Sequence, residues 1–273
     1  MKRSLLTFSI LISCISFSAQ TIAGAAIVEP LFTKSAKISD HYIVDAYIET
    51  YKGRQFQEID DVDATELRLD VVFPILTNSQ LRLSVPFSTD GDGVRIDNGD
   101  KTNINGNNGT LNFVSLAYEY QFMHKADDNM DVMAYANVGT RVANLETSHG
   151  DNMNHQGRNI KAGFKLNTEI SSSLLFLTDM GYQYYWVSDD LNPSGGGDKF
   201  GNVVASFAVI KHDRSLKPAV ELTYRGDFGN YNNLAISPEL IYSFENVDLK
   251  LALPIGITSD ADDYGVTIGL TFR

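Results

Sequence analysis

The last ten residues of the chain, Tyr264 to Arg273, alternate strictly between two kinds of side chain. One set is apolar, and the other contains only glycine, threonine and arginine. A period of two residues predicts a β-strand, because successive side chains of a strand point to opposite faces. A strand with one apolar face and one small or polar face is typical of a barrel wall with lipid outside and water inside.

The N-terminus has the parts of a secretory signal peptide. Lys2 and Arg3 precede an apolar stretch that ends at Phe17, and small residues follow it. This stretch is shorter than the roughly 20 residues that a membrane-spanning helix needs. We therefore expect residues 1–23 to be cleaved, with cleavage after Ala25 as the alternative.

This division leaves residues 24–40 as a periplasmic N-terminal segment and residues 41–273 as the barrel. Cys14, the only cysteine, lies in the leader, so cleavage leaves no thiol for a disulfide or a thiolate metal site. An alternative remains open, because Leu11 to Cys14 resembles a bacterial lipobox, which would make Cys14 a lipidated N-terminus. Labelling with a fatty acid separates the two interpretations.

The formal charge of −12 becomes −14 when Lys2 and Arg3 are removed with the leader. Such acidity argues against a nucleic-acid partner, which would require a basic surface. The rest of the chain has no apolar run near 18 residues. A membrane-embedded chain of this kind must form a closed barrel, because open sheet edges cannot satisfy their hydrogen bonds in lipid.

Twelve segments follow the two-residue pattern over lengths that cross a bilayer. Their number is even, as in single-chain bacterial barrels. The sequence thus predicts an all-β fold, a single antiparallel up-and-down barrel of twelve strands. The segments are residues 41–53, 63–76, 79–89, 110–124, 129–143, 157–171, 173–188, 199–212, 216–227, 233–245, 247–259 and 263–273.

The connections alternate in length, which a soluble β-sandwich has no reason to do. Short turns are typical of the periplasmic side, so both termini are expected there. The long connections at 90–109, 144–156 and 189–198 are rich in Gly, Asn, Asp and Ser and are predicted to be extracellular. We expect lipid and lipopolysaccharide around such a barrel.

Aromatic residues form two predicted belts on the outward face, separated by aliphatic residues. Rings with a polar and an apolar part favour membrane interfaces. One belt lies at the periplasmic ends and contains Phe73, Tyr118, Tyr120, Phe122, Tyr242, Phe244 and Phe272. The other contains Phe87, Tyr184, Trp186, Tyr224 and Tyr264.

The opposite face of the strands is strongly charged. A Lys or Arg facing lipid at mid-depth would cost about 2–4 kcal/mol, so these charges are predicted to line the lumen. They could line a narrow conduit with a transverse field, or pair across the interior and fill it. The predicted lumen-lining residues are Glu66, Arg68, Asp70, Arg82, Glu119, Arg141, Lys161, Lys165, Glu169, Asp179, Lys217, Glu221, Arg225, Glu239 and Lys250.

Five prolines fall inside the predicted strands, where each lacks the N–H that a ladder bond needs. We expect bulges or strand ends at these positions. They are Pro74, Pro86, Pro218, Pro238 and Pro254.

The histidines do not form a recognisable catalytic pattern, and we expect no catalytic site, metal or cofactor. His149 and His155 lie in a polar loop, where a metal site is less favoured than a solvated loop. The carboxylates between Asp90 and Asp100 are clustered, yet they lack the EF-hand spacing. Weak calcium binding by the 90–109 loop remains an alternative that calorimetry would test.

The segments 67–74, 81–87 and 249–254, with the terminal Gly-Leu-Thr-Phe, are similar to outer-membrane barrels of the type associated with the MetA pathway of phenol degradation. The resemblance covers most of the mature chain and implies a channel for small aromatic or hydrophobic compounds. It carries over no catalytic residue. The aromatic ending also resembles the strand that engages the barrel-assembly machinery, with Phe272 one position before the usual place.

These observations together favour a passive outer-membrane channel for small solutes, exported into a Gram-negative envelope. The first alternative is a non-conducting structural or surface-interaction barrel. The second is an outer-membrane enzyme.

Overall fold

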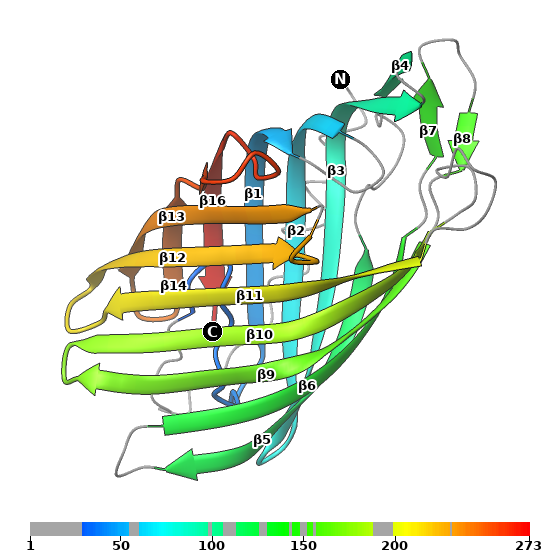
Figure 1. Cartoon of the computed structure of the whole chain (residues 1–273). Helices are drawn as coiled ribbons and strands as arrows, with labels where there is room; N and C mark the ends of the chain where they lie inside the picture. The colour runs from blue at the N-terminus through cyan, green and yellow to red at the C-terminus, as the bar shows by residue number, and fades with distance from the viewer. Residues whose placement is uncertain are drawn as a thin grey trace, which may run out of the picture.

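The computed structural model describes residues 29–54, 60–97, 100–105, 113–125, 130–141, 144–147, 152–154, 157–187, 199–229 and 231–273. Within these ranges, no helix is long and apolar enough to cross a membrane. The described chain is built from antiparallel strands that form a ring (Figure 1).

Twelve strand positions close this ring in the order β1, β2, β3, β5, β6, β9, β10, β11, β12, β13, β14 and β16, with β15 continuing the position of β14. The pairings β1 with β16 and β2 with β3 complete it. The predicted twelve-stranded all-β barrel is therefore confirmed. The strands are β1 (Ile43–Arg54), β2 (Asp60–Leu76), β3 (Ser79–Asp97), β5 (Val114–Lys125), β6 (Met130–Arg141), β9 (Gly157–Ser171), β10 (Leu174–Val187), β11 (Lys199–Lys211), β12 (Leu216–Gly226), β13 (Asn232–Ser243), β14 (Val247–Ala252), β15 (Ile255–Gly256) and β16 (Tyr264–Phe272).

The C-terminal strand shows how the sequence pattern becomes a wall. Along β16 the side chains alternate between exposed and buried, with Ile268 exposed and Thr267 buried. Thr271 faces inward and donates a hydrogen bond of 2.5 Å to Asp45 of β1, its register partner. The seam between the first and last strands is thus fixed by a polar contact inside and apolar contacts outside.

Two predicted loops contain further strands. β3 continues to Asp97 and pairs with β4 (Asp100–Asn105). β4 pairs with β7 (Asn144–Thr147), and β7 pairs with β8 (Asn152–Asn154). Figure 1 shows this extension standing beyond the ring at the end of β3. The predicted connections 90–109 and 144–156 therefore contain strand that lies beyond the bounds of the predicted segments.

Pro74, Pro238 and Pro254 lie where the ladder is interrupted, as expected, whereas Pro86 and Pro218 lie in regularly paired stretches of β3 with β2 and of β12 with β13. The register of β2 against β3 shifts between Pro74 and Leu76. Pro254 separates β14 from β15, opposite Pro238, whose carbonyl accepts the N–H of Leu253 at 3.1 Å. A missing N–H is tolerated at Pro74, Pro238 and Pro254 because the neighbouring strand is not continuously paired there.

Residues 29–41, which we call the strap, precede β1 and fold into the ring instead of extending away from it (Figure 1). The strap forms neither strand nor helix. Leu31 and Ala36 are almost fully buried, and Leu31 packs with Tyr47 and Ala252. The described part of the predicted N-terminal segment thus lies within the barrel. The side of the membrane on which the termini lie stays a prediction.

Candidate functional site

The barrel encloses a cavity of about 420 Å³, lined by residues of every strand position in the ring except those of β14 and β16. Its lining combines charges of both signs with amides, hydroxyls and aromatic rings. Ten predicted lumen residues lie on this lining, namely Glu66, Arg68, Asp70, Arg82, Glu119, Arg141, Lys161, Lys165, Asp179 and Arg225. They come together because alternate residues of every strand point inward.

A charge cluster centred on Glu119 lies against the wall formed by β3, β5 and β9. Glu119 is 1% exposed and accepts a hydrogen bond of 2.6 Å from Lys165 Nζ. Arg82 Nε donates to the same carboxylate at 3.1 Å, and Gln80 donates to its other oxygen at 2.6 Å. Every polar atom of this carboxylate is therefore satisfied, which is the condition under which buried charges persist.

A second cluster surrounds two aspartates of neighbouring strands. Lys34 of the strap lies 3.7 Å from a carboxylate oxygen of Asp45 and 3.8 Å from one of Asp70. Lys250 approaches Asp45 from the other side at 3.8 Å, and Arg68 Nε contacts Asp70 at 3.2 Å. This cluster ties the strap to β1 and β2 and leaves Arg68 on the cavity lining.

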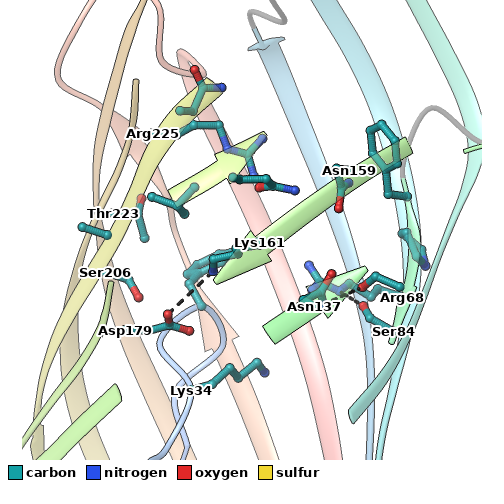
Figure 2. A pocket seen from close by; sticks show the side chains of 18 of the residues that line it. Lys34, Arg68, Ser84, Asn137, Asn159, Lys161, Asp179, Ser206, Thr223 and Arg225 are labelled. Atoms are coloured by element: carbon teal, nitrogen blue, oxygen red, sulfur yellow. Dashed lines mark hydrogen bonds and ion pairs between the residues drawn. The ribbon is translucent and has the colours of Figure 1, made fainter. Parts of the chain in front are cut away.

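The middle of the cavity carries an opposed pair of charges. Figure 2 shows Lys161 and Asp179 pointing toward each other from β9 and β10, with Nζ and Oδ1 separated by 3.6 Å. Tyr135 donates to Asp179 at 2.7 Å, and the Lys161 ammonium lies over the Tyr135 ring. The pair thus presents one positive and one negative group to the lumen.

A row of polar side chains crosses four neighbouring strands beside this pair. Asn137, Lys161, Gln183 and Asn202 are successive register partners on β6, β9, β10 and β11. Asn202 of β11 and Asn159, which lies two residues before Lys161 on β9, are each 2% exposed. Their Oδ1 atoms have no hydrogen-bond partner within the described residues. Both asparagines belong to the cavity lining and add amide groups to its polar surface.

Aromatic rings line the cavity farther toward the end of β10. Tyr185 stacks on Phe200 with ring centroids 4.8 Å apart and meets Phe113 at 5.5 Å. The guanidinium of Arg141 lies 4.7 Å from the centre of the Phe113 ring. This part of the lining can therefore contact the apolar face of a solute while Arg141 supplies a charge.

The other five predicted lumen residues face inward away from the cavity lining. Glu221, Glu239 and Lys250 are buried beneath or beside the strap, and Lys217 and Glu169 lie toward the ends of β12 and β9 that bear short turns. Lys217 contacts Ser243. The charged inner face is thus partly cavity wall and partly the support of the strap.

The strap is held by four side chains that accept main-chain N–H groups. Glu239 accepts from Leu31 at 3.2 Å, and Glu221 accepts from Phe32 at 3.2 Å and from Thr33 at 2.7 Å. The other two acceptors are Asn167, bonded to the N–H of Ala36 at 2.9 Å, and Gln80, bonded to that of Ser39 at 3.0 Å.

Sequence reasoning missed the strap and its acceptors Asn167 and Gln80. It also missed Asp45 and Glu49, because the apolar run Tyr42, Ile43 and Val44 at the start of the first strand places apolar residues on both faces. The inward alternation of Asp45, Tyr47, Glu49 and Tyr51 is present in the sequence and could have located them.

The outer surface is a band of exposed aliphatic and aromatic residues. Eight of the predicted interface aromatics are exposed, namely Phe87, Tyr118, Tyr120, Phe122, Trp186, Tyr242, Phe244 and Tyr264. The others, Phe73, Tyr184, Tyr224 and Phe272, are half-buried. An apolar band of this size requires an apolar surrounding, whereas the depth of each ring in a membrane stays a prediction.

Among the residues that the structure describes, no three His, Cys, Asp or Glu side chains could hold a metal ion. His124 lies 2.6 Å from Asp131, and His41 lies 2.5 Å from Asp40. His149, His155, residues 1–23, Cys14 and the side chains of the carboxylates from Asp90 to Asp100 lie outside what the structure describes.

No family model and no curated protein matches the sequence. Solved structures do match the fold. An outer membrane channel from Pseudomonas putida F1 has a TM-score of 0.55 at 10% identity, over 90% of this chain and 99% of that one. The translocator domain of the autotransporter NalP from Neisseria meningitidis has a TM-score of 0.54 at 11% identity, over 86% and 89% of the two chains. The NanC porin has a TM-score of 0.52 at 16% identity, over 84% and 99%. At these identities the likeness establishes the outer-membrane barrel fold and leaves the solute open.

Proposed function

We propose that this barrel is a passive outer-membrane channel for small polar solutes. The observation that carries the proposal is the contrast between the two faces of the wall. The cavity is lined by paired charges, amides and aromatic rings, whereas the outer surface of the barrel is apolar. A lining of this kind replaces part of a solute's hydration shell, so a polar solute can enter without a large loss of hydrogen bonding. The likeness to a channel and a porin supports the same assignment.

The proposal places the protein in the outer membrane of a Gram-negative bacterium, after export by residues 1–23 and assembly through the C-terminal strand. Lipid and lipopolysaccharide would surround the band of exposed apolar residues, and both termini would lie in the periplasm. The resemblance of 67–74 and 81–87 to channels of phenol-degradation pathways adds an expectation that some solutes are aromatic. The rings at Tyr185 and Phe200 would suit such a solute.

Ion selectivity in a planar bilayer tests this function. Lys161→Gln and Asp179→Asn remove opposite charges that lie 3.6 Å apart at the same depth of the cavity. The reversal potential in a salt gradient should move toward cation selectivity for the first variant and toward anion selectivity for the second. The control is Lys211→Gln, because Lys211 is exposed at the end of β11.

Equal reversal potentials in all three variants would contradict passage through this cavity. A folded, inserted barrel that carries no current, with or without the strap, would overturn the channel proposal. The second candidate, a non-conducting surface barrel, would then be preferred. The close pairing of Arg82, Glu119 and Lys165 favours that candidate, because it shows that part of the lumen serves to fill the barrel.

A further inference from the structure

The strap crosses the full width of the lumen. In the order of the ring, β3 and β12 are six positions apart in either direction among twelve, and so lie on opposite sides. The strap hydrogen-bonds to Glu221 of β12 through Thr33 and to Gln80 of β3 through Ser39. Between these points Ala36 bonds to Asn167 of β9. Any solute that passes along the barrel must pass this segment.

The wall recognises the strap through its main chain. Five N–H groups, spread from Leu31 to Ser39, donate to four side-chain acceptors on four different strands. Such bonds hold an extended peptide with little regard to its side chains. Two buried carboxylates, Glu221 and Glu239, provide three of the five bonds and lie on adjacent strands.

Ionic contacts fix the position of the strap. Glu29 accepts a hydrogen bond of 3.0 Å from Arg82 Nη2, and Lys34 lies between Asp45 and Asp70. The Glu29 carboxylate also forms a contact within the strap, because it accepts the N–H of Ser35 at 2.9 Å. The position of the strap along the barrel wall is therefore set by two charged side chains, Glu29 near its beginning and Lys34 near its middle.

The wall is complete without the strap. No residue of the strap takes part in a strand pairing, and the ladder between β1 and β2 begins only at Ile43 and Val72. The strap can therefore leave the lumen by a movement about residues 40–42 while every backbone ladder of the barrel stays intact. The acceptors that it vacates point into the barrel interior beneath the strap, where water can replace the lost N–H donors.

We propose that the strap is a displaceable plug. The inner surface that carries its acceptors Gln80, Asn167, Glu221 and Glu239 is then a peptide-binding site that the strap of the same chain occupies. The inference rests on the proposed channel function and adds a gate to it. With the strap bound, the passage is constricted at the level of Glu221 and Gln80. With the strap released, the passage widens to the barrel wall.

Single-channel recording of the refolded mature chain and of a chain that begins at residue 41 tests the gate. The shortened chain should give larger and longer-lived conductance steps. Equal steps in both proteins would overturn the gate and leave the channel function standing. A folded, silent pair would overturn both, whereas current from the shortened chain alone would support both.

A second measurement tests the gate without the shortened chain, in case that chain fails to fold. The mature chain has no cysteine after cleavage at 23, so Ala36→Cys introduces a single thiol at a position that is 0% exposed. Reaction with a small charged thiol reagent should be slow in this variant and at least about ten-fold faster when Glu221→Gln and Glu239→Gln are added, because neutral acceptors bind N–H groups less strongly. Ser172→Cys, at an exposed turn, should react quickly in both backgrounds. An unchanged rate at position 36, in a protein whose different gel migration with and without heating shows that the barrel is folded, would overturn the proposal.

Discussion

Replacing Arg82 with methionine removes a buried guanidinium that joins the barrel wall to the strap. Arg82 Nε contacts Glu119 at 3.1 Å, and Nη2 contacts Glu29 at 3.0 Å. The exposed fractions of the Arg82 and Glu29 side chains are only 8% and 7%, so water does not replace the lost donor freely. Methionine keeps much of the volume, and the loss is therefore mainly electrostatic.

The expected cost follows from these contacts. Two charge-assisted hydrogen bonds at about 1.5–3 kcal/mol each give an upper range of about 3–6 kcal/mol. Glu119 keeps Lys165 and Gln80, and Glu29 keeps the N–H of Ser35, so the carboxylates are not fully orphaned. We expect a loss of about 3 kcal/mol in the free energy of unfolding, at the low end of the cost of breaking a buried ion pair.

Urea unfolding in lipid vesicles measures this loss. Trp186 is the only tryptophan, and its outward side chain moves from an apolar to an aqueous environment when the barrel unfolds. The matched control is Lys52→Met, which breaks a pair with Asp63 whose side chains are 48% and 43% exposed. That change should cost less than about 1 kcal/mol. Equal losses in the two variants would refute the argument that burial sets the strength of the Arg82 contacts.

Two further substitutions test the wall itself. Ile268→Arg places a charge in the middle of the outer face of β16 and should cost about 2–4 kcal/mol in vesicle unfolding; a neutral result would mean that this face does not meet lipid. Gly163→Ala adds a Cβ that would lie 2.1 Å from the carbonyl oxygen of Met180, and should lower the unfolding free energy by about 1–3 kcal/mol through overpacking. Gly229→Ala, where the nearest atom lies at 3.4 Å, should change the thermal midpoint little; equal shifts for both glycines would contradict the packing argument.

The barrel could be predicted from sequence because each strand carries its own pattern of inward and outward side chains. β9 and β16 each show the inward and outward alternation within a single strand, and their observed bounds lie within two residues of the predicted ones. The twelve-strand closure follows from the number of such segments, since every edge strand in lipid requires a partner.

The parts that escaped prediction depend on long-range contacts. The strap has no two-residue period, and its main-chain N–H groups bond to side chains as far as 208 residues away. β4 lies in a stretch rich in Gly and Asn, and its pairing with β7 joins Ile104 to Thr147 across the predicted loops. Neither pairing can be read from the residues of one segment alone.

Solute entry into vesicles tests the central claim most directly. Vesicles that contain the refolded protein, in wild-type form and beginning at residue 41, are placed in iso-osmotic solutions of uncharged sugars of increasing size. A channel with the lumen described here predicts swelling with the smallest sugars, faster in the shortened protein, and exclusion of the largest. Vesicles that carry folded, inserted protein of both forms and yet do not swell with any sugar would contradict the account.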